Sequence, residues 1–99
     1  MDKDIIEKIK ELASQARQYF DFEKVVVYGS YSNKTNRPDS DIDVAFFVKR
    51  ITADHWNLSS KLFELVDKID YRIEPVIISE YEDKSGFAVS ILANGIVVC

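Results

Sequence analysis

Residues 25–48 read VVVYGSYSNKTNRPDSDIDVAFFV, and this stretch decides the fold. It begins with a β-branched run, residues 25–28, that is typical of a short buried strand. A polar loop over residues 29–40 follows, and residues 41–48 alternate in the manner of a second strand. Two consecutive strands are therefore predicted, with a glycine and a serine at the end of the first and two aspartates at the start of the second.

The second predicted strand carries both aspartates on one face. Side chains two positions apart on a strand point the same way, so Asp41 and Asp43 share a face with Ala45 and Phe47. Two unit charges 4 Å apart repel by about 4 kcal/mol at an effective dielectric constant of ~20. A divalent cation relieves this repulsion, and carboxylates combined with substrate phosphates suit Mg²⁺. By itself, however, Asp-x-Asp more often marks two solvent-facing aspartates.

The glycine–serine pair directly after the first strand changes that interpretation. Gly29 allows the backbone to approach a ligand closely, and Ser30 is suited to cap a helical turn or to donate its hydroxyl to a phosphate. Alone, such a pair is usually only a turn. Its spacing from the Asp-x-Asp pair favours a phosphate cradle and metal ligands that meet at the ends of adjacent strands. Tyr28 and Tyr31 flank the turn, where a ring can pack on a base, although core or surface packing is their more common role.

The flanking sequence completes an α/β layered domain. Apolar spacing predicts a helix over residues 4–20, and Asp54 is the expected N-cap of a second helix with a core stripe from Leu58 to Ile69. A third strand is predicted over 71–79, a last helix over 82–93 that stops at Asn94-Gly95, and a closing strand over 96–98. Pro75 indicates either that the third strand is an edge strand or that the missing N–H of Pro75 faces no partner. The order predicts a mixed β-sheet with flanking helices.

Length and composition narrow the class of protein. The chain has 99 residues, so a single domain over 1–99 is expected. It contains no apolar run long enough for a transmembrane helix and its charged N-terminus lacks the apolar core of a signal peptide. The net charge is −4 and no basic stripe occurs, so we expect no direct binding of nucleic acid. The lone Cys99 cannot form an internal disulfide, which fits a cytoplasmic location.

A third carboxylate, Glu74, lies on the third predicted strand. It shares a face with Arg72, Val76 and Ile78. If that strand lies beside the second, Glu74 approaches Asp41 and Asp43. It is then placed to accept the proton of an attacking hydroxyl and to share a second metal ion. An exposed glutamate on an edge strand is the alternative interpretation.

The stretch from Val25 to Val44 resembles the signature of the DNA polymerase beta-like nucleotidyltransferases. That signature is a strand, Gly-Ser, a polar loop and then Asp-x-Asp on the next strand, and Ser40 before the first aspartate also matches. At this length the chain looks like a minimal nucleotidyltransferase (MNT), with the nucleotidyltransferase fold. The resemblance covers nearly the whole chain.

The resemblance implies a role for each matching residue. Asp41 and Asp43 would hold metal, with two Mg²⁺ ions the expected number, and Gly29 and Ser30 would contact the phosphates of ATP. The third acidic position falls at Glu74, where the family more often has aspartate, so Glu74 is the expected third metal ligand and base.

The loop departs from the family pattern, which often has arginine and glycine four and five positions after the first glycine. This chain has Asn33 and Lys34 at those positions. Lys34 or Arg37 is therefore the expected source of the missing phosphate contact, Lys34 as a point charge. Ser40 completes the predicted set of nucleotide-binding residues.

The resemblance also implies a partner. Many MNT proteins pair with a helical HEPN ribonuclease, and such an antitoxin adds AMP to a tyrosine of its toxin. We therefore expect a Mg-dependent nucleotidyltransferase that acts on a HEPN-type partner, in a hetero-oligomer or as a homodimer. One alternative is an antitoxin without catalysis that neutralises a ribonuclease by occlusion. Another is a small-molecule modifier such as an aminoglycoside nucleotidyltransferase, which ranks last because those enzymes carry an additional domain.

Overall fold

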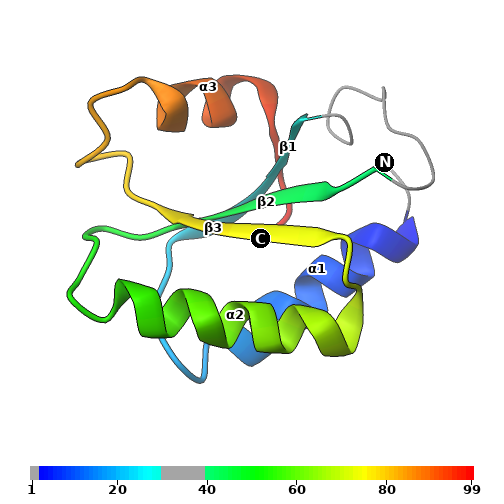
Figure 1. Cartoon of the computed structure of the whole chain (residues 1–99). Helices are drawn as coiled ribbons and strands as arrows, with labels where there is room; N and C mark the ends of the chain where they lie inside the picture. The colour runs from blue at the N-terminus through cyan, green and yellow to red at the C-terminus, as the bar shows by residue number, and fades with distance from the viewer. Residues whose placement is uncertain (1–2, 30–39) are drawn as a thin grey trace.

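The computed structural model describes residues 3–29 and 40–99. Its elements are α1 (Lys3–Ala16), β1 (Lys24–Tyr28), β2 (Ile42–Phe47), α2 (His55–Ile69), β3 (Ile73–Ile78), α3 (Phe87–Asn94) and β4 (Ile96–Val97). The strands form one sheet in the order β3-β2-β1-β4, in which β2 and β3 are parallel and the other pairs are antiparallel. α1 and α2 cover one face of the sheet and α3 covers the other (Figure 1). The predicted α/β fold with a mixed sheet is confirmed.

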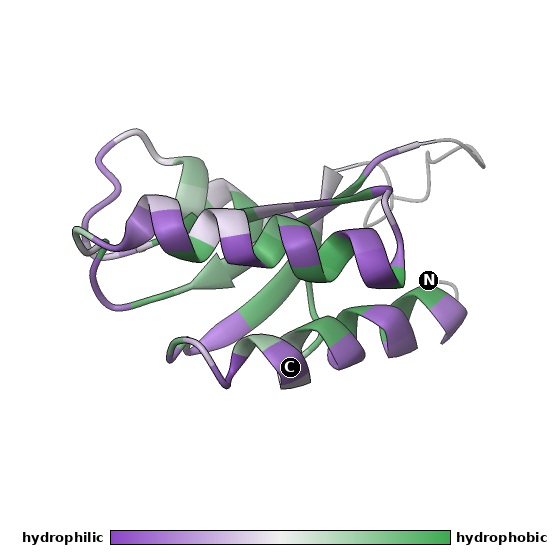
Figure 2. Ribbon diagram, turned by 60° about the horizontal axis from the view of Figure 1, so that its bottom comes forward, coloured by the Kyte–Doolittle hydropathy of each residue, from purple (hydrophilic) through white to green (hydrophobic). Residues whose placement is uncertain are grey.

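The alternation of β2 divides the apolar residues into two clusters, as the sequence predicted. Ile42, Val44 and Phe46 pack with α1 and α2, whereas Ala45 and Phe47 pack beneath α3. Fully burying a side chain of this kind contributes roughly 1.5–3 kcal/mol, so the sheet is stabilised from both faces. Hydrophobic and hydrophilic residues alternate along α1 and α2, in agreement with the helical spacing of their sequences (Figure 2). No helix in the described ranges is long and apolar enough to cross a membrane.

Two helices, α1 and α3, differ from their predicted bounds. α1 ends at Ala16 instead of residue 20, because the chain turns there and the rings of Phe20, Phe22 and Phe46 pack together. α2 begins after Asp54 as expected, but the Asp54 side chain makes no capping hydrogen bond to the helix. Aromatic packing therefore ended the first helix where local periodicity predicted a further turn.

The last helix begins later than predicted, at Phe87 instead of residue 82. The Asp83 carboxylate accepts a hydrogen bond from the Ala88 N–H at 2.6 Å, and the Ser85 hydroxyl accepts one from the Phe87 N–H at 3.2 Å. Short polar side chains of this type compete with the helix for backbone groups. The segment before Phe87 is therefore a capping loop that fixes the start of α3.

Gly95 ends α3, as the sequence predicted, but the reason is room and not a left-handed conformation. Its φ of −87° and ψ of 175° are extended values open to any residue. A Cβ atom at this position would lie 2.5 Å from Cγ1 of Val26, 2.6 Å from the carbonyl oxygen of Ile91 and 2.8 Å from that of Val27. Only glycine allows α3 to turn into β4 this close to β1.

Gly95→Ala is expected to destabilise the protein by about 3 kcal/mol, because two of the crowded neighbours are backbone atoms that cannot rotate away. The free energy of unfolding in urea measures this effect. Ala93→Gly, at an exposed position in the same helix, is the control and should cost only about 1 kcal/mol. Equal losses for the two variants would show that the close approach is unimportant.

A charged cluster joins the start of β3 to the helices. The Asp70 carboxylate accepts hydrogen bonds from Arg72 Nε at 3.0 Å, from Arg72 Nη2 at 2.7 Å and from Lys8 Nζ of α1 at 3.1 Å. Its side chain is 6% exposed. The Arg72 carbonyl in turn accepts the Ile42 N–H at 2.8 Å. Asp70 therefore helps to set β3 against β2, and with it the position of Glu74.

Asp70→Asn is expected to lower the free energy of unfolding at pH 7 by about 2 kcal/mol, because a nearly buried arginine pair loses its anion. Hydrogen bonds from Arg72 hold the pKa of Asp70 well below its usual range. Its contribution is therefore full above the unfolded-state pKa of about 3.9 and is lost as the pH falls toward the folded-state pKa. Urea unfolding from pH 7 to pH 2.5 should show the difference between wild type and variant shrinking below about pH 4. Asp67→Asn, exposed on α2, is the control; a difference that does not change with pH would contradict this account.

Candidate functional site

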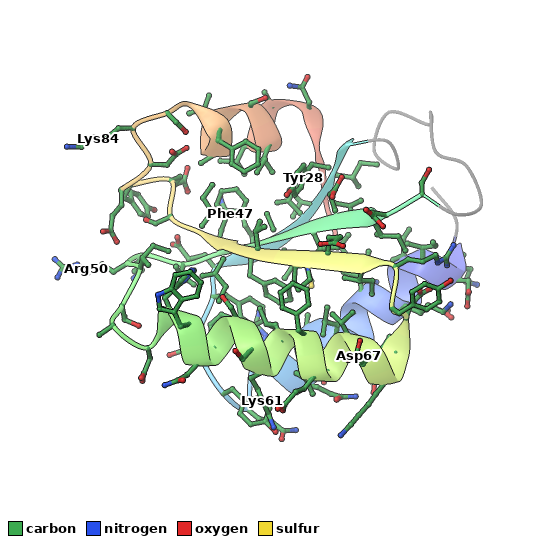
Figure 3. The ribbon with its side chains drawn as sticks, in the orientation of Figure 1. Tyr28, Phe47, Arg50, Lys61, Asp67 and Lys84 are labelled. Carbon is green, nitrogen blue, oxygen red and sulfur yellow. The ribbon has the colours of Figure 1, made fainter. Side chains whose placement is uncertain are left out.

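Three side chains lie in a row across the sheet on the face that α3 covers. Asp43 of β2 is directly opposite Tyr28 of the antiparallel β1 and directly opposite Glu74 of the parallel β3. Figure 3 shows Tyr28 between the sheet and α3. β3 does lie beside β2, and it is one of the two edge strands of the sheet that the described residues form, as Pro75 indicated. The condition under which Glu74 approaches the aspartates is therefore met.

Gly29 lies directly against the carboxylate of Asp43. Its φ is +73°, and a Cβ atom placed on it would be 2.5 Å from Oδ2 of Asp43. Glycine is required twice here, for the left-handed backbone and for the close approach. The end of β1 and the start of β2 therefore meet at one point, where the sequence predicted a phosphate turn beside metal ligands.

The carboxylates are close enough to perturb one another. Burial raises the pKa of Asp43, and the negative charges of Asp41 and then Glu74 raise it further. Burial also raises the pKa of Tyr28, with contributions from Asp43 and Glu74. Asp41, just before β2, is exposed, and Glu74 is exposed on β3. The site is thus an open, electronegative cluster that a cation would stabilise.

The donor set fits Mg²⁺ with ligands from a substrate. Within residues 3–29 and 40–99, no three acidic, histidine or cysteine side chains converge tightly enough to hold a metal ion alone. Mg²⁺ is commonly bound by one or two carboxylates, with water and phosphate oxygens as its other ligands. The crowded carboxylates of Asp41 and Asp43 match that requirement.

Part of the predicted nucleotide contact lies outside the described residues. This applies to Ser30, Lys34 and Arg37, whose roles remain predictions. Ser40 is described; it is partly buried and immediately precedes Asp41. Of the predicted set, the structure therefore brings together Gly29, the two aspartates and Glu74.

The sequence interpretation missed Phe87, the first residue of α3. Its ring is 5.8 Å from that of Tyr28, centroid to centroid, with an interplanar angle of 86°. The side chain is 46% exposed although α3 packs on the sheet. No local pattern links Phe87 to the turn, because its position depends on how α3 crosses β1.

A cavity of about 540 Å³ lies elsewhere. Its lining includes Phe22, Val48, Arg50 and Leu58, near the opposite ends of β1 and β2, and includes none of the three carboxylates. In Figure 3 Arg50 lies at the left edge of the molecule, away from Tyr28. Since this cavity contains neither Gly29 nor the paired carboxylates that suit Mg²⁺, the carboxylate cluster is the better candidate site.

Comparisons with known proteins show the family and the fold of the chain. The profile of a family described as "Polymerase beta, Nucleotidyltransferase" matches residues 7–99. Among curated protein sequences, none matches the chain significantly.

Three solved structures share the fold. A candidate nucleotidyltransferase from Sulfolobus solfataricus has a TM-score of 0.68 at 20% identity, over 93% of this chain and 77% of that chain. A chain of a toxin–antitoxin complex with AMP-PNP has a TM-score of 0.63 at 21% identity, over 95% and 72%. A chain of the tri-AMPylated Shewanella oneidensis HEPN toxin in complex with its MNT antitoxin has a TM-score of 0.57 at 18% identity, over 95% and 68%.

Proposed function

Since the chain belongs to the polymerase beta nucleotidyltransferase family, we propose that it transfers AMP from ATP to a hydroxyl group of a HEPN-type partner. The observation that carries this proposal is the row of Asp43 and Glu74 across β2 and β3, with Gly29 against the Asp43 carboxylate. This arrangement supports the proposal because Gly29, the two carboxylates proposed to bind metal and a further carboxylate lie at one end of the sheet.

The nucleotide would bind with its phosphates at Gly29 and Ser30. Lys34, Arg37 and Ser40 are the further residues proposed to contact it. Asp41 and Asp43 would hold Mg²⁺, with Glu74 sharing a second ion, and the bound metal would neutralise charge on the phosphates. Because the charges of Asp41 and Glu74 raise the pKa of Asp43, a cation bound beside Asp43 would relieve their repulsion.

In the transfer step, the acceptor oxygen attacks the α-phosphorus of ATP in line with the leaving group. The new O–P bond forms as the bond from the α-phosphorus to the bridging oxygen breaks, and pyrophosphate leaves. Glu74, exposed at the edge of the sheet, would accept the proton from the attacking hydroxyl. Positioning of the two reactants would supply much of the rate enhancement.

The partner is proposed from the shared fold and the resemblance of the signature. Two of the similar structures are toxin–antitoxin complexes, and one of them holds an AMPylated HEPN toxin. Their identity to this chain, 21% and 18%, supports a shared fold alone. The net charge of −4 suits a basic partner surface, such as that of an RNA-cleaving enzyme.

The deciding experiment incubates the full chain and a HEPN partner with ATP labelled on the α-phosphate. We expect the label on the partner in the presence of Mg²⁺ and none after chelation with EDTA. Labelling that is equal with and without Mg²⁺ would contradict the mechanism. Stoichiometric inhibition of the ribonuclease in the absence of ATP, with no label transferred, would instead support neutralisation by occlusion.

A further inference from the structure

We propose that the ring of Phe87, packed edge to face with Tyr28, is an aromatic platform on which the nucleobase of the triphosphate stacks. This subsite rests on the proposed function, because it assumes that the phosphates bind at the turn that begins with Gly29. It adds a contact to α3, an element outside the predicted phosphate and metal-binding machinery.

The platform lies beside the carboxylates. Tyr28 is directly opposite Asp43 in the sheet and immediately precedes Gly29. The two rings meet edge to face, 5.8 Å apart at an interplanar angle of 86°, so Tyr28 packs against Phe87 and does not share a stacking plane with it. Figure 3 shows Tyr28 beneath α3, on the same side of the sheet as Phe47. A planar group attached to a ligand at the carboxylates would therefore be close to these rings.

The exposure of Phe87 distinguishes it from the core residues of α3. Ala88 and Ile91 are 1% and 2% exposed, whereas Phe87 is 46% exposed. Packing on the sheet therefore leaves much of the Phe87 side chain uncovered. Aromatic rings with an open face are the usual partners of bases, because every base has a π face.

The position of the aromatic pair in the sheet favours the nucleobase, and not the acceptor, as the group that binds to it. Glu74, the proposed proton acceptor, lies on β3, whereas Tyr28 lies on β1, on the other side of Asp43. The acceptor hydroxyl must therefore approach from the β3 side. The phosphate turn and the aromatic pair share the β1 side, so a single nucleotide can reach both.

The platform is also held in place. The Ala88 N–H donates a hydrogen bond to the Asp83 carboxylate and the Phe87 N–H donates one to the Ser85 hydroxyl, and these bonds fix the first turn of α3. A pre-positioned ring loses little entropy when a ligand binds.

The test compares two probes in the full chain by titration calorimetry with Mg²⁺ present. AMP-PNP carries a base, and inorganic tripolyphosphate does not. Phe87→Ala should weaken AMP-PNP binding by roughly five- to thirtyfold and leave tripolyphosphate binding within about twofold of wild type. Phe87→Leu, which keeps an apolar contact to Tyr28, should also weaken AMP-PNP binding, whereas Phe87→Tyr should restore it.

Val89→Ala is the matched control, because Val89 is 66% exposed on the same helix. It should bind both probes as wild type does. The proposal is wrong if Phe87→Ala binds AMP-PNP as tightly as wild type, if both probes weaken equally, or if only transfer to the partner falls. If wild type binds neither probe, the proposed function is wrong, and the subsite with it. If wild type binds both probes and Phe87→Ala binds them equally well, the subsite alone is wrong.

Discussion

Asp43→Asn is expected to reduce AMP transfer to the partner roughly a thousandfold, equivalent to about 4 kcal/mol of transition-state stabilisation. Asp43 is the central residue of the site, because it lies opposite both Tyr28 and Glu74 and against Gly29. Asparagine keeps the shape of the side chain and removes the charge that the metal requires. Initial rates of label transfer at saturating ATP and Mg²⁺ measure the effect.

The same variant should be at least as stable as wild type when Mg²⁺ is absent. The pKa of Asp43 is raised in the folded protein by burial and by Asp41 and Glu74, so its ionised form opposes folding at pH 7. A neutral asparagine removes that repulsion. Asp67→Asn, on the opposite side of the sheet, is the control and should keep both activity and stability. Transfer by Asp43→Asn at the wild-type rate would show that the carboxylate cluster is not the active site.

Gly29→Ala is expected to reduce transfer roughly a hundredfold with a modest loss of stability, about 1–2 kcal/mol. The new methyl group would lie 2.5 Å from Oδ2 of Asp43, an atom at the free end of a side chain. The carboxylate can rotate away, so the collision costs little stability. It costs function, because the rotated carboxylate no longer faces the metal and the phosphates.

Gly86→Ala separates backbone strain from this collision. Gly86 has a φ of +84°, close to the +73° of Gly29, but a Cβ atom on it would meet nothing within 4 Å. Both variants should lose a similar amount of stability in urea, and only Gly29→Ala should lose most of its transfer activity. Equal activity in the two variants would mean that Gly29 serves the turn alone.

The strands and their faces were predictable because they depend on short-range periodicity. The alternation of β2 placed Asp43 on the face opposite Ile42 and Val44, and the packing of the two clusters agrees. Helix bounds were less predictable. α3 begins at Phe87 because Asp83 and Ser85 bind its first N–H groups, a choice that helical spacing does not reveal.

The sequence by itself determined the α/β fold, the two-faced second strand and the pairing of Gly29 with the Asp-x-Asp motif, because each depends on residues close together in the chain. Only the tertiary structure decided that Glu74 lies opposite Asp43, that Phe87 contacts Tyr28 and that Gly29 leaves room for one carboxylate. These are contacts between separate elements. They depend on strand order, register and the crossing of a helix over the sheet, and periodicity along one segment carries no information about them.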